Sequence, residues 1–258
     1  MKGLDGYSAV ITGAGRGIGA AAATAFVEAG AKVTLAARSE DQVADVAKSL
    51  QASGHEAFCF PCDVTDPLAV LDLVRAARGA MGRIDILVNN AGTASSNPLG
   101  RTPLIEWQRI MDVNATGTFL CTQAVWGGMT DQCWGRVVNV ASIAGLRGGK
   151  YISAYTAAKH AVVGFTRAMA AEAVGSGITV NAVCPGYVDT PLTDETISRV
   201  MHHTGKSREE SLNSVLEEAS QARLIHMSEV TREILRLCNA GSDAPNGELV
   251  VIDGSDSE

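Results

Sequence analysis

Short runs rich in valine, isoleucine and alanine alternate with longer amphipathic stretches along most of this 258-residue chain. The short runs are continuously apolar, as expected of strands that are buried on both faces of a parallel sheet. Strands are predicted at 7–12, 32–37, 56–62, 84–90, 135–142, 178–185 and 247–253. Between them, apolar residues recur at the spacing of a helical turn. Helices are predicted at 18–29, 40–52, 67–79, 103–129, 153–175 and 228–239.

This alternation predicts an α/β fold in which helices cover both faces of a parallel sheet of about seven strands. The expected architecture is a doubly wound, three-layer sandwich formed by one domain, residues 1–258. The pattern is interrupted at 191–222, a polar stretch with two short helical periods. A polar helical insertion of this kind is typical of a lid over a substrate site, and a solvated surface decoration is the alternative.

Composition narrows the functional classes. Hydrophobic residues make up 46% of the chain and charged residues 19%, which provides enough apolar material for a core. The net charge of −7 argues against nucleic acid as a partner, because no basic surface offsets phosphate repulsion. No apolar run reaches membrane-spanning length and no apolar leader precedes the first strand. We therefore expect a cytoplasmic protein without a membrane partner.

The cysteines indicate neither a disulfide framework nor a metal site. Cys59 and Cys62 form a C-x-x-C pair, a spacing that serves redox or zinc sites in other proteins. No second pair follows at a metal-binding spacing, and the pair falls within a predicted strand. We predict buried, reduced thiols and no bound metal.

A glycine-rich turn joins the first predicted strand to the first helix, in the sequence VITGAGRGIG. Its glycines at 13, 15, 17 and 19 permit a tight turn. They also let the backbone approach a pyrophosphate at the N-terminus of the helix. In this position between strand and helix, the turn predicts a dinucleotide-binding site.

The end of the second predicted strand distinguishes between the two nicotinamide dinucleotides. A NAD site usually ends this strand with an acidic residue that binds the ribose 2′-hydroxyl. Here Arg38 follows the strand, and a carboxylate comes only at Glu40. Arg38 can hold a 2′-phosphate through paired, charged hydrogen bonds, and Arg16 in the glycine-rich turn can supply a second cation. The pattern favours NADPH/NADP as the cofactor, with NAD as the alternative.

A tyrosine and a lysine lie one turn apart on the fifth predicted helix, at Tyr155 and Lys159. The spacing alone is a weak signal. A free phenol has a pKa of about 10, which is too high for proton exchange at neutral pH. A nearby ammonium favours the phenolate and lowers that pKa. Beside a dinucleotide, the pair predicts an acid–base site.

Together these motifs resemble the short-chain dehydrogenase/reductase family over nearly the whole chain. TGAGRGIG is similar to the family's cofactor turn, CDV to its adenine-contacting segment, NNAG to its central strand end, and CPGYVDTP to the segment beside the nicotinamide. The resemblance implies a Rossmann-type fold and catalysis by Asn114, Ser142, Tyr155 and Lys159. The residues expected to contact the dinucleotide are Thr12, Gly13, Gly15, Arg16, Gly17, Ile18, Gly19, Arg38, Asp63, Val64, Asn90, Ala91, Gly92, Tyr155, Lys159, Pro185, Gly186, Val188 and Thr190.

The resemblance also implies roles. Hydride passes to a carbonyl carbon while Tyr155 protonates the oxygen, and Ser142 holds and polarises that oxygen. Lys159 additionally binds the nicotinamide ribose, and Asn114 holds a water that links the lysine to solvent. Outside this set, we expect His160 to point away from the lysine. Tyr151 is expected to line the substrate pocket.

The stretch that follows the catalytic tyrosine resembles polyketide ketoreductases, 3-oxoacyl-carrier-protein reductases and 3-hydroxybutyrate dehydrogenases. The preferred interpretation is NADPH-dependent reduction of a 3-oxoacyl or polyketide-like carbonyl, free or bound to coenzyme A or a carrier protein. Candidate contacts to a carrier phosphate are Arg147, Lys150, Lys206 and Arg208, and ordinary solvated cations are the alternative interpretation.

Two other functions stay open on the sequence. One is a NAD-dependent secondary alcohol or 3-hydroxyacyl dehydrogenase. The other is a non-catalytic dinucleotide-binding partner subunit. The family resemblance also implies a homotetramer, or a dimer.

Overall fold

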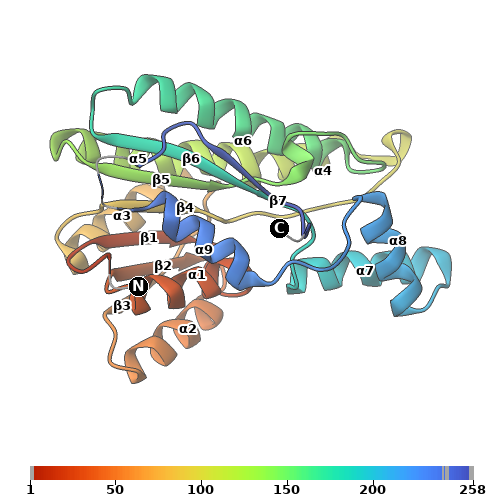
Figure 1. Ribbon diagram of the computed structural model, residues 1–258, viewed down its shortest axis with the longest axis horizontal. Coiled ribbons are helices and arrows are strands. Elements are labelled where there is room, and N and C mark those ends of the chain that lie inside the picture. The colour runs from red at the N-terminus through yellow and green to blue at the C-terminus, as the bar shows by residue number, and fades with distance from the viewer. Residues whose placement is uncertain (1–2, 240, 242–243, 256–258) are drawn as a thin grey trace.

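The computed structural model describes residues 3–239, 241 and 244–255. A seven-stranded sheet forms its centre, in the order β3-β2-β1-β4-β5-β6-β7 (Figure 1). All neighbouring strands are parallel. The strands are β1 (Ser8–Thr12), β2 (Lys32–Ala37), β3 (Ala57–Pro61), β4 (Ile86–Asn89), β5 (Gly135–Val140), β6 (Ile178–Pro185) and β7 (Leu249–Ile252).

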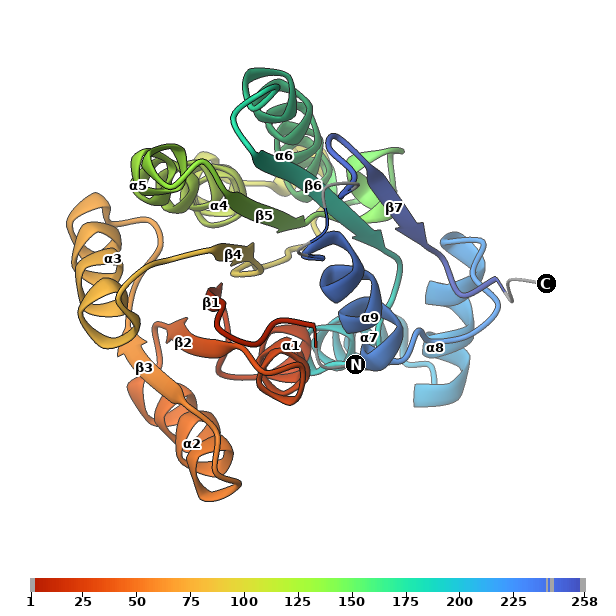
Figure 2. The same cartoon turned by 60° about the vertical axis from the view of Figure 1, so that its left-hand side comes forward.

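Helices cover both faces of the sheet, as Figure 2 shows. One face carries α1 (Gly17–Glu28), α2 (Glu40–Ala52) and α9 (Met227–Leu237). The other face carries α3 (Pro67–Met81), α5 (Gly117–Asp131) and α6 (Ser153–Glu172). The predicted doubly wound, three-layer α/β fold is confirmed.

Each strand contributes to two cores because successive side chains point to opposite faces. In β1, Ile11 packs into the core beneath α1, whereas Val10 packs with Leu73 on the other face. All five residues of β1 are buried. This two-sided burial is the reason why the strands read as continuous apolar runs in the sequence.

The helix predicted at 103–129 is interrupted, so this prediction is wrong in part. The segment forms α4 (Leu104–Met111), a π-turn at Asp112–Thr116, and α5. Asn114 lies in the turn, and its amide nitrogen donates to the backbone oxygens of Thr93 (2.8 Å) and Ile110 (2.9 Å). The Thr118 hydroxyl donates to the backbone oxygen of Asn114 at 2.8 Å. These side chains satisfy backbone groups that the irregular turn frees.

The insertion near 191–222 contains the two helices that its sequence predicts. They are α7 (Pro191–Thr204) and α8 (Arg208–Glu218), and they project from one end of the sheet (Figure 1). Gly205 between them has a φ of 70°, a conformation that glycine adopts readily. Short 3₁₀ turns lie at Leu99–Arg101 and Ile143–Gly145.

Cysteine placement differs from the expectation of two buried thiols. Cys62 is buried, and burial, reinforced by Asp63 and Asp66, raises the pKa of its thiol to about 11. Cys59 is exposed, because residues three apart on a strand point to opposite faces. Within the described residues, no group of three or more His, Cys, Asp or Glu side chains is placed to hold a metal ion.

The sequence predicts no membrane-spanning helix, and the lengths and apolar content of the described helices agree with that prediction. None of those in the described part of the chain combines the length and the apolar character that crossing a membrane requires.

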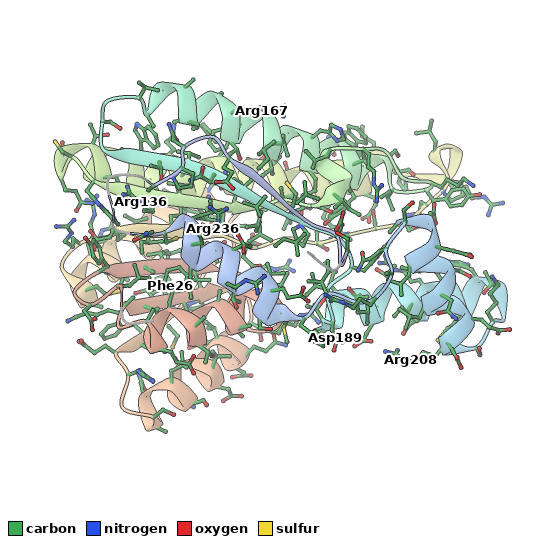
Figure 3. All side chains as sticks on the ribbon, in the orientation of Figure 1. Phe26, Arg136, Arg167, Asp189, Arg208 and Arg236 are labelled. Carbon is green, nitrogen blue, oxygen red and sulfur yellow. The ribbon has the colours of Figure 1, made fainter. Side chains whose placement is uncertain are left out.

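Phe26, labelled in Figure 3, is a fully buried aromatic side chain between α1 and the sheet. We expect Phe26→Ala to lower the free energy of unfolding by about 3–5 kcal/mol, because it leaves a cavity in the core. Chemical denaturation measures this change. Leu68→Ala is the control: Leu68 is 71% exposed on α3, and its replacement should shift stability by less than about 0.5 kcal/mol. Equal losses for the two variants would contradict the packing described here.

Candidate active site

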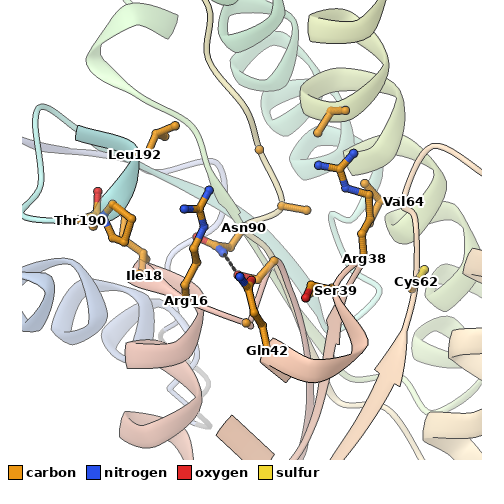
Figure 4. Close-up of a pocket in the computed structure, with 18 of the residues that line it drawn as sticks. Arg16, Ile18, Arg38, Ser39, Gln42, Cys62, Val64, Asn90, Thr190 and Leu192 are labelled. Carbon is orange, nitrogen blue, oxygen red and sulfur yellow. Dashed lines mark hydrogen bonds between the residues drawn. The ribbon is translucent and has the colours of Figure 1, made fainter. Parts of the chain in front are cut away.

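A cleft of about 680 Å³ opens where β1, β2, β3 and β4 end, beside the start of α7 (Figure 4). Its volume is that of an ordinary small-molecule site. Many of the predicted dinucleotide contacts line it: Gly13, Gly15, Arg16, Gly17, Ile18, Arg38, Asp63, Val64, Asn90, Ala91, Gly92 and Thr190. The sequence analysis missed the remaining lining residues, which are Ala37, Ser39, Gln42, Cys62, Val113, Pro191 and Leu192.

Most of these missed residues are neighbours of a motif residue in the chain, and that adjacency was the available signal. Gln42 is different, since it belongs to α2. A Cβ atom built on Gly15 would lie 3.0 Å from Gln42 Cβ, so the side chain of Gln42 packs directly against the glycine-rich turn. No sequence motif indicates this contact.

Thr12 and Asn90 tie the ends of β1 and β4 together. The Thr12 hydroxyl oxygen accepts hydrogen bonds from the backbone N–H groups of Asn90 and Ala91, both at 3.0 Å. The Asn90 amide donates to the backbone oxygens of Thr12 (3.0 Å) and Gly13 (3.1 Å). Thr12 is itself buried, so it stabilises the wall of the cleft without lining it.

Glycine is required in the turn for two physical reasons. Gly13 and Gly17 have φ values of 64° and 59°, which side-chain-bearing residues rarely adopt. A Cβ atom at Gly19 would lie only 2.4 Å from the backbone oxygen of Gly13. Gly19 therefore packs helix α1 against the turn.

The cleft has the features that a dinucleotide needs. Helix α1 begins at Gly17 and has no acidic residue in its first turn, so its N-terminus can face an anion. Arg16 and Arg38 add positive charge to the same lining. The residues present therefore fit the pyrophosphate and adenosine portions of a nicotinamide dinucleotide.

The predicted dinucleotide contacts Pro185, Gly186 and Val188 are not among the residues that line this cleft. The Pro185 backbone oxygen accepts a hydrogen bond from the Ser142 hydroxyl at 3.4 Å. Gly186 is covered by the side chain of Gln221, whose amide oxygen would lie 2.2 Å from a Cβ atom there. Val188 is buried and pairs with Ile225 in a parallel bridge.

The four predicted catalytic residues come together from three elements. Tyr155 and Lys159 lie on α6, and the ammonium nitrogen is 5.7 Å from the phenol ring centre. Ser142 follows β5, and its side chain lies close enough to Tyr155 to influence the pKa of the phenol. Asn114 comes from the π-turn: a Cβ atom built on Gly92 would lie 2.9 Å from Asn114 Oδ1 and 3.8 Å from Lys159 Nζ.

Burial sets the charge states of this group. It raises the pKa of Tyr155 to about 12, and the side chain of Ser142 acts in the opposite direction. It lowers the pKa of Lys159 to about 8. The Lys159 ammonium donates to the backbone oxygen of Val140 at 2.7 Å. In the protein alone, burial is the largest influence on the Tyr155 pKa, and the lowering expected from Lys159 beside a bound dinucleotide stays a prediction.

His160 and Tyr151 lie outside this group. His160 is exposed, and its Nδ1 lies 2.9 Å from the backbone oxygen of Thr156, so it points away from Lys159 as predicted. Tyr151 is 60% exposed and accepts a backbone hydrogen bond from Asn97 at 2.7 Å. Its place in the substrate pocket stays a prediction.

Three of the four candidate carrier-binding cations have partners within the protein. Arg208 forms an ion pair with Asp194, and Lys206 donates to the Ser214 hydroxyl at 2.9 Å. Arg147 donates to the backbone oxygen of Ala219, at the end of α8. These contacts connect the two lid helices to each other and to the segment after β5.

A parallel sheet with a dinucleotide cleft beside a tyrosine–lysine pair defines a nicotinamide-linked oxidoreductase. The family model described as short chain dehydrogenase matches residues 8–200, and the chain belongs to this family. The oxidoreductase function predicted from the sequence fits the family better than a non-catalytic subunit does.

Relatives and solved structures agree with this assignment over most of the chain. A 3-oxoacyl-[acyl-carrier-protein] reductase of Synechocystis sp. is 40% identical over 195 residues, which is 75% of this chain and 79% of the relative. A D-beta-hydroxybutyrate dehydrogenase of Rhizobium meliloti is 35% identical over 252 residues, 96% and 97% of the two chains. The crystal structure of an actinorhodin polyketide ketoreductase variant with NADPH superposes with a TM-score of 0.92, at 34% identity, and covers 98% of both chains.

We expect Tyr155→Phe to reduce kcat by about 10²–10⁴-fold, because it removes the proton donor, while dinucleotide binding persists. Steady-state kinetics and a binding titration measure the two effects. Tyr7→Phe is the control, since Tyr7 precedes β1, at the opposite end of that strand from the cleft, and its ring packs against Trp134. Full activity in Tyr155→Phe would show that the phenol plays no part in the reaction.

Lys159 should give stability a characteristic dependence on pH. Its pKa is lowered from 10.5 to about 8, so the unfolded chain binds more protons between these pH values. The stability of the wild type relative to Lys159→Met should therefore rise as the pH increases from about 8 to 10. Urea denaturation of both proteins over this range measures the difference. Tyr155 acts in the opposite direction only above about pH 10. A difference that falls with pH would refute the lowered lysine pKa.

Proposed function

We propose that this protein reduces a 3-oxoacyl or polyketide-like carbonyl with NADPH. The observation that carries the cofactor assignment is the position of Arg38, directly after β2 in the lining of the cleft. A guanidinium there can bind a 2′-phosphate bidentately, where a carboxylate would repel it. Arg16, in the same lining, is proposed as the second phosphate contact.

The chemistry assigns a separate task to each residue. When bound, the dinucleotide supplies the hydride. Ser142 holds the substrate carbonyl oxygen next to the Tyr155 hydroxyl, and Tyr155 donates its proton to that oxygen. With the dinucleotide bound, Lys159 would donate to the ribose hydroxyls in place of the Val140 carbonyl. Asn114 would hold a water beside Lys159, through which the proton of Tyr155 is replaced. The raised pKa of Tyr155 keeps the phenol protonated at neutral pH, which is the form that reduction consumes.

The substrate is proposed to be a small carbonyl compound, free or carried on coenzyme A or a carrier protein, under a lid formed by residues 191–222. The names of the 3-oxoacyl reductase and polyketide ketoreductase relatives support this class. Because Arg147, Lys206 and Arg208 have partners within the protein, Lys150 is the strongest of the four candidates for a carrier phosphate. We also propose a cytoplasmic homotetramer or dimer without nucleic acid or membrane partners; the net charge of −7 supports the absence of a nucleic-acid partner.

A second candidate function is oxidation of a 3-hydroxy acid. The similarity to a D-beta-hydroxybutyrate dehydrogenase over 96% of the chain favours it. The two functions differ in cofactor preference and direction, which a comparison of NADPH-linked reduction with NAD-linked oxidation resolves.

Arg38→Asp tests the proposed cofactor. We expect kcat/KM for NADPH to fall by about 10- to 100-fold, the loss of charged hydrogen bonds of about 1.5–3 kcal/mol, with NADH used better than by the wild type. Initial rates from the absorbance of the reduced nicotinamide measure both. Arg75→Asp is the control, because Arg75 is an exposed residue of α3 paired with Asp72. An unchanged ratio of NADPH to NADH activity in Arg38→Asp would refute the proposal.

A further inference from the structure

Arg16, the second proposed phosphate contact, already has an anionic partner. Its Nη1 donates to Glu195 Oε1 at 2.9 Å. Arg16 belongs to the glycine-rich turn, and Glu195 belongs to α7, whose first residues line the same cleft (Figure 4). The ion pair therefore joins two walls of the dinucleotide cleft.

The two walls also touch beside the pair. A Cβ atom built on Gly17 would lie 3.7 Å from Thr190 Cγ2 and 4.0 Å from Pro191 Cδ. The start of α7 thus lies in contact range of the turn, and Arg16 need not move far to reach either Glu195 or a ligand in the cleft. Both side chains of the pair are about half exposed, at 53% and 52%. An ion pair this exposed is weak enough to exchange partners.

We propose that Glu195 determines the cofactor preference by competing with the 2′-phosphate for Arg16. This inference rests on the proposed use of NADP. When NADP binds, Arg16 leaves Glu195 for the phosphate, and the carboxylate of Glu195 stays close enough to oppose the added negative charge. With NAD there is no phosphate, and Arg16 keeps Glu195. Glu195 thus weakens NADP binding selectively, because it competes for one of the two arginines that contact the phosphate.

The adjacent carboxylate provides a matched comparison. Asp194 precedes Glu195 on α7 and forms its ion pair with Arg208 of α8, within the lid. Asp194→Asn removes the same charge one residue away, from a pair that does not include the glycine-rich turn. A general effect of lid charge on anionic ligands would appear in both variants, whereas competition for Arg16 is confined to Glu195.

The experiment measures dissociation constants for NADPH and NADH by fluorescence titration, in the wild type, Glu195→Gln and Asp194→Asn. In Glu195→Gln we expect NADPH to bind about two- to fivefold more tightly and NADH to be little changed. Asp194→Asn should alter neither. In an Arg16→Ala background the selective effect of Glu195→Gln should shrink, because the residue they compete for is absent. Retained NADH binding shows that each variant is folded.

The inference is overturned if Glu195→Gln leaves the ratio of the two dissociation constants unchanged. It is also overturned if the shift persists in full without Arg16. Failure of the proposed NADP use has a different signature: Arg38→Asp would then leave NADPH binding unaffected, whatever residue stands at 195.

Discussion

Hydrogen bonds between Thr12 and Asn90 hold the ends of β1 and β4 together, at the place where the strand order of the sheet diverges. From β1 the strand order runs to β2 and β3 on one side and to β4 and beyond on the other. The connections after β1 and β4 therefore leave toward opposite faces, and a cleft opens between them. Four hydrogen bonds across this divergence keep the glycine-rich turn and the Asn90 segment in register. The positions of the nucleotide cleft and the tyrosine–lysine helix follow from that register.

The sequence alone predicted the layers of the fold because the relevant signals are local. The strand expected at 178–185 coincides with β6, because this run is buried on both faces and is therefore mostly apolar. The helix expected at 103–129 was only partly right, because the π-turn depends on Asn114 bonding to Thr93, which lies 21 residues away. The ion pair between Arg16 and Glu195 spans 179 residues, and no local pattern indicates it.

The sequence predicts which residues form the site better than it predicts their charge states. The motifs indicated that Asn114, Ser142, Tyr155 and Lys159 form one site. The structure places these residues near one another, in the π-turn, after β5 and on α6. Protonation depends instead on burial and on which partner a side chain meets. Lys159 meets the Val140 carbonyl, and this contact arises only from the packing of α6 against the end of β5. Burial thus shifts both groups toward their uncharged forms in the free protein, which raises the pKa of Tyr155 and lowers that of Lys159.

The insertion at 191–222 leaves and rejoins the rest of the domain at one place. The Asp189 N–H donates to the Ile225 oxygen at 2.9 Å, the Ile225 N–H donates to the Tyr187 oxygen at 3.0 Å, and the Gln221 amide bonds to both backbone groups of Tyr187. Because closing a longer loop costs little additional entropy once its ends are fixed, residues between these anchors can be added or removed without disturbing the sheet. Variation in the part of the insertion that lies beyond the cleft-lining start of α7 can therefore accumulate in evolution without altering the sheet that positions the cleft.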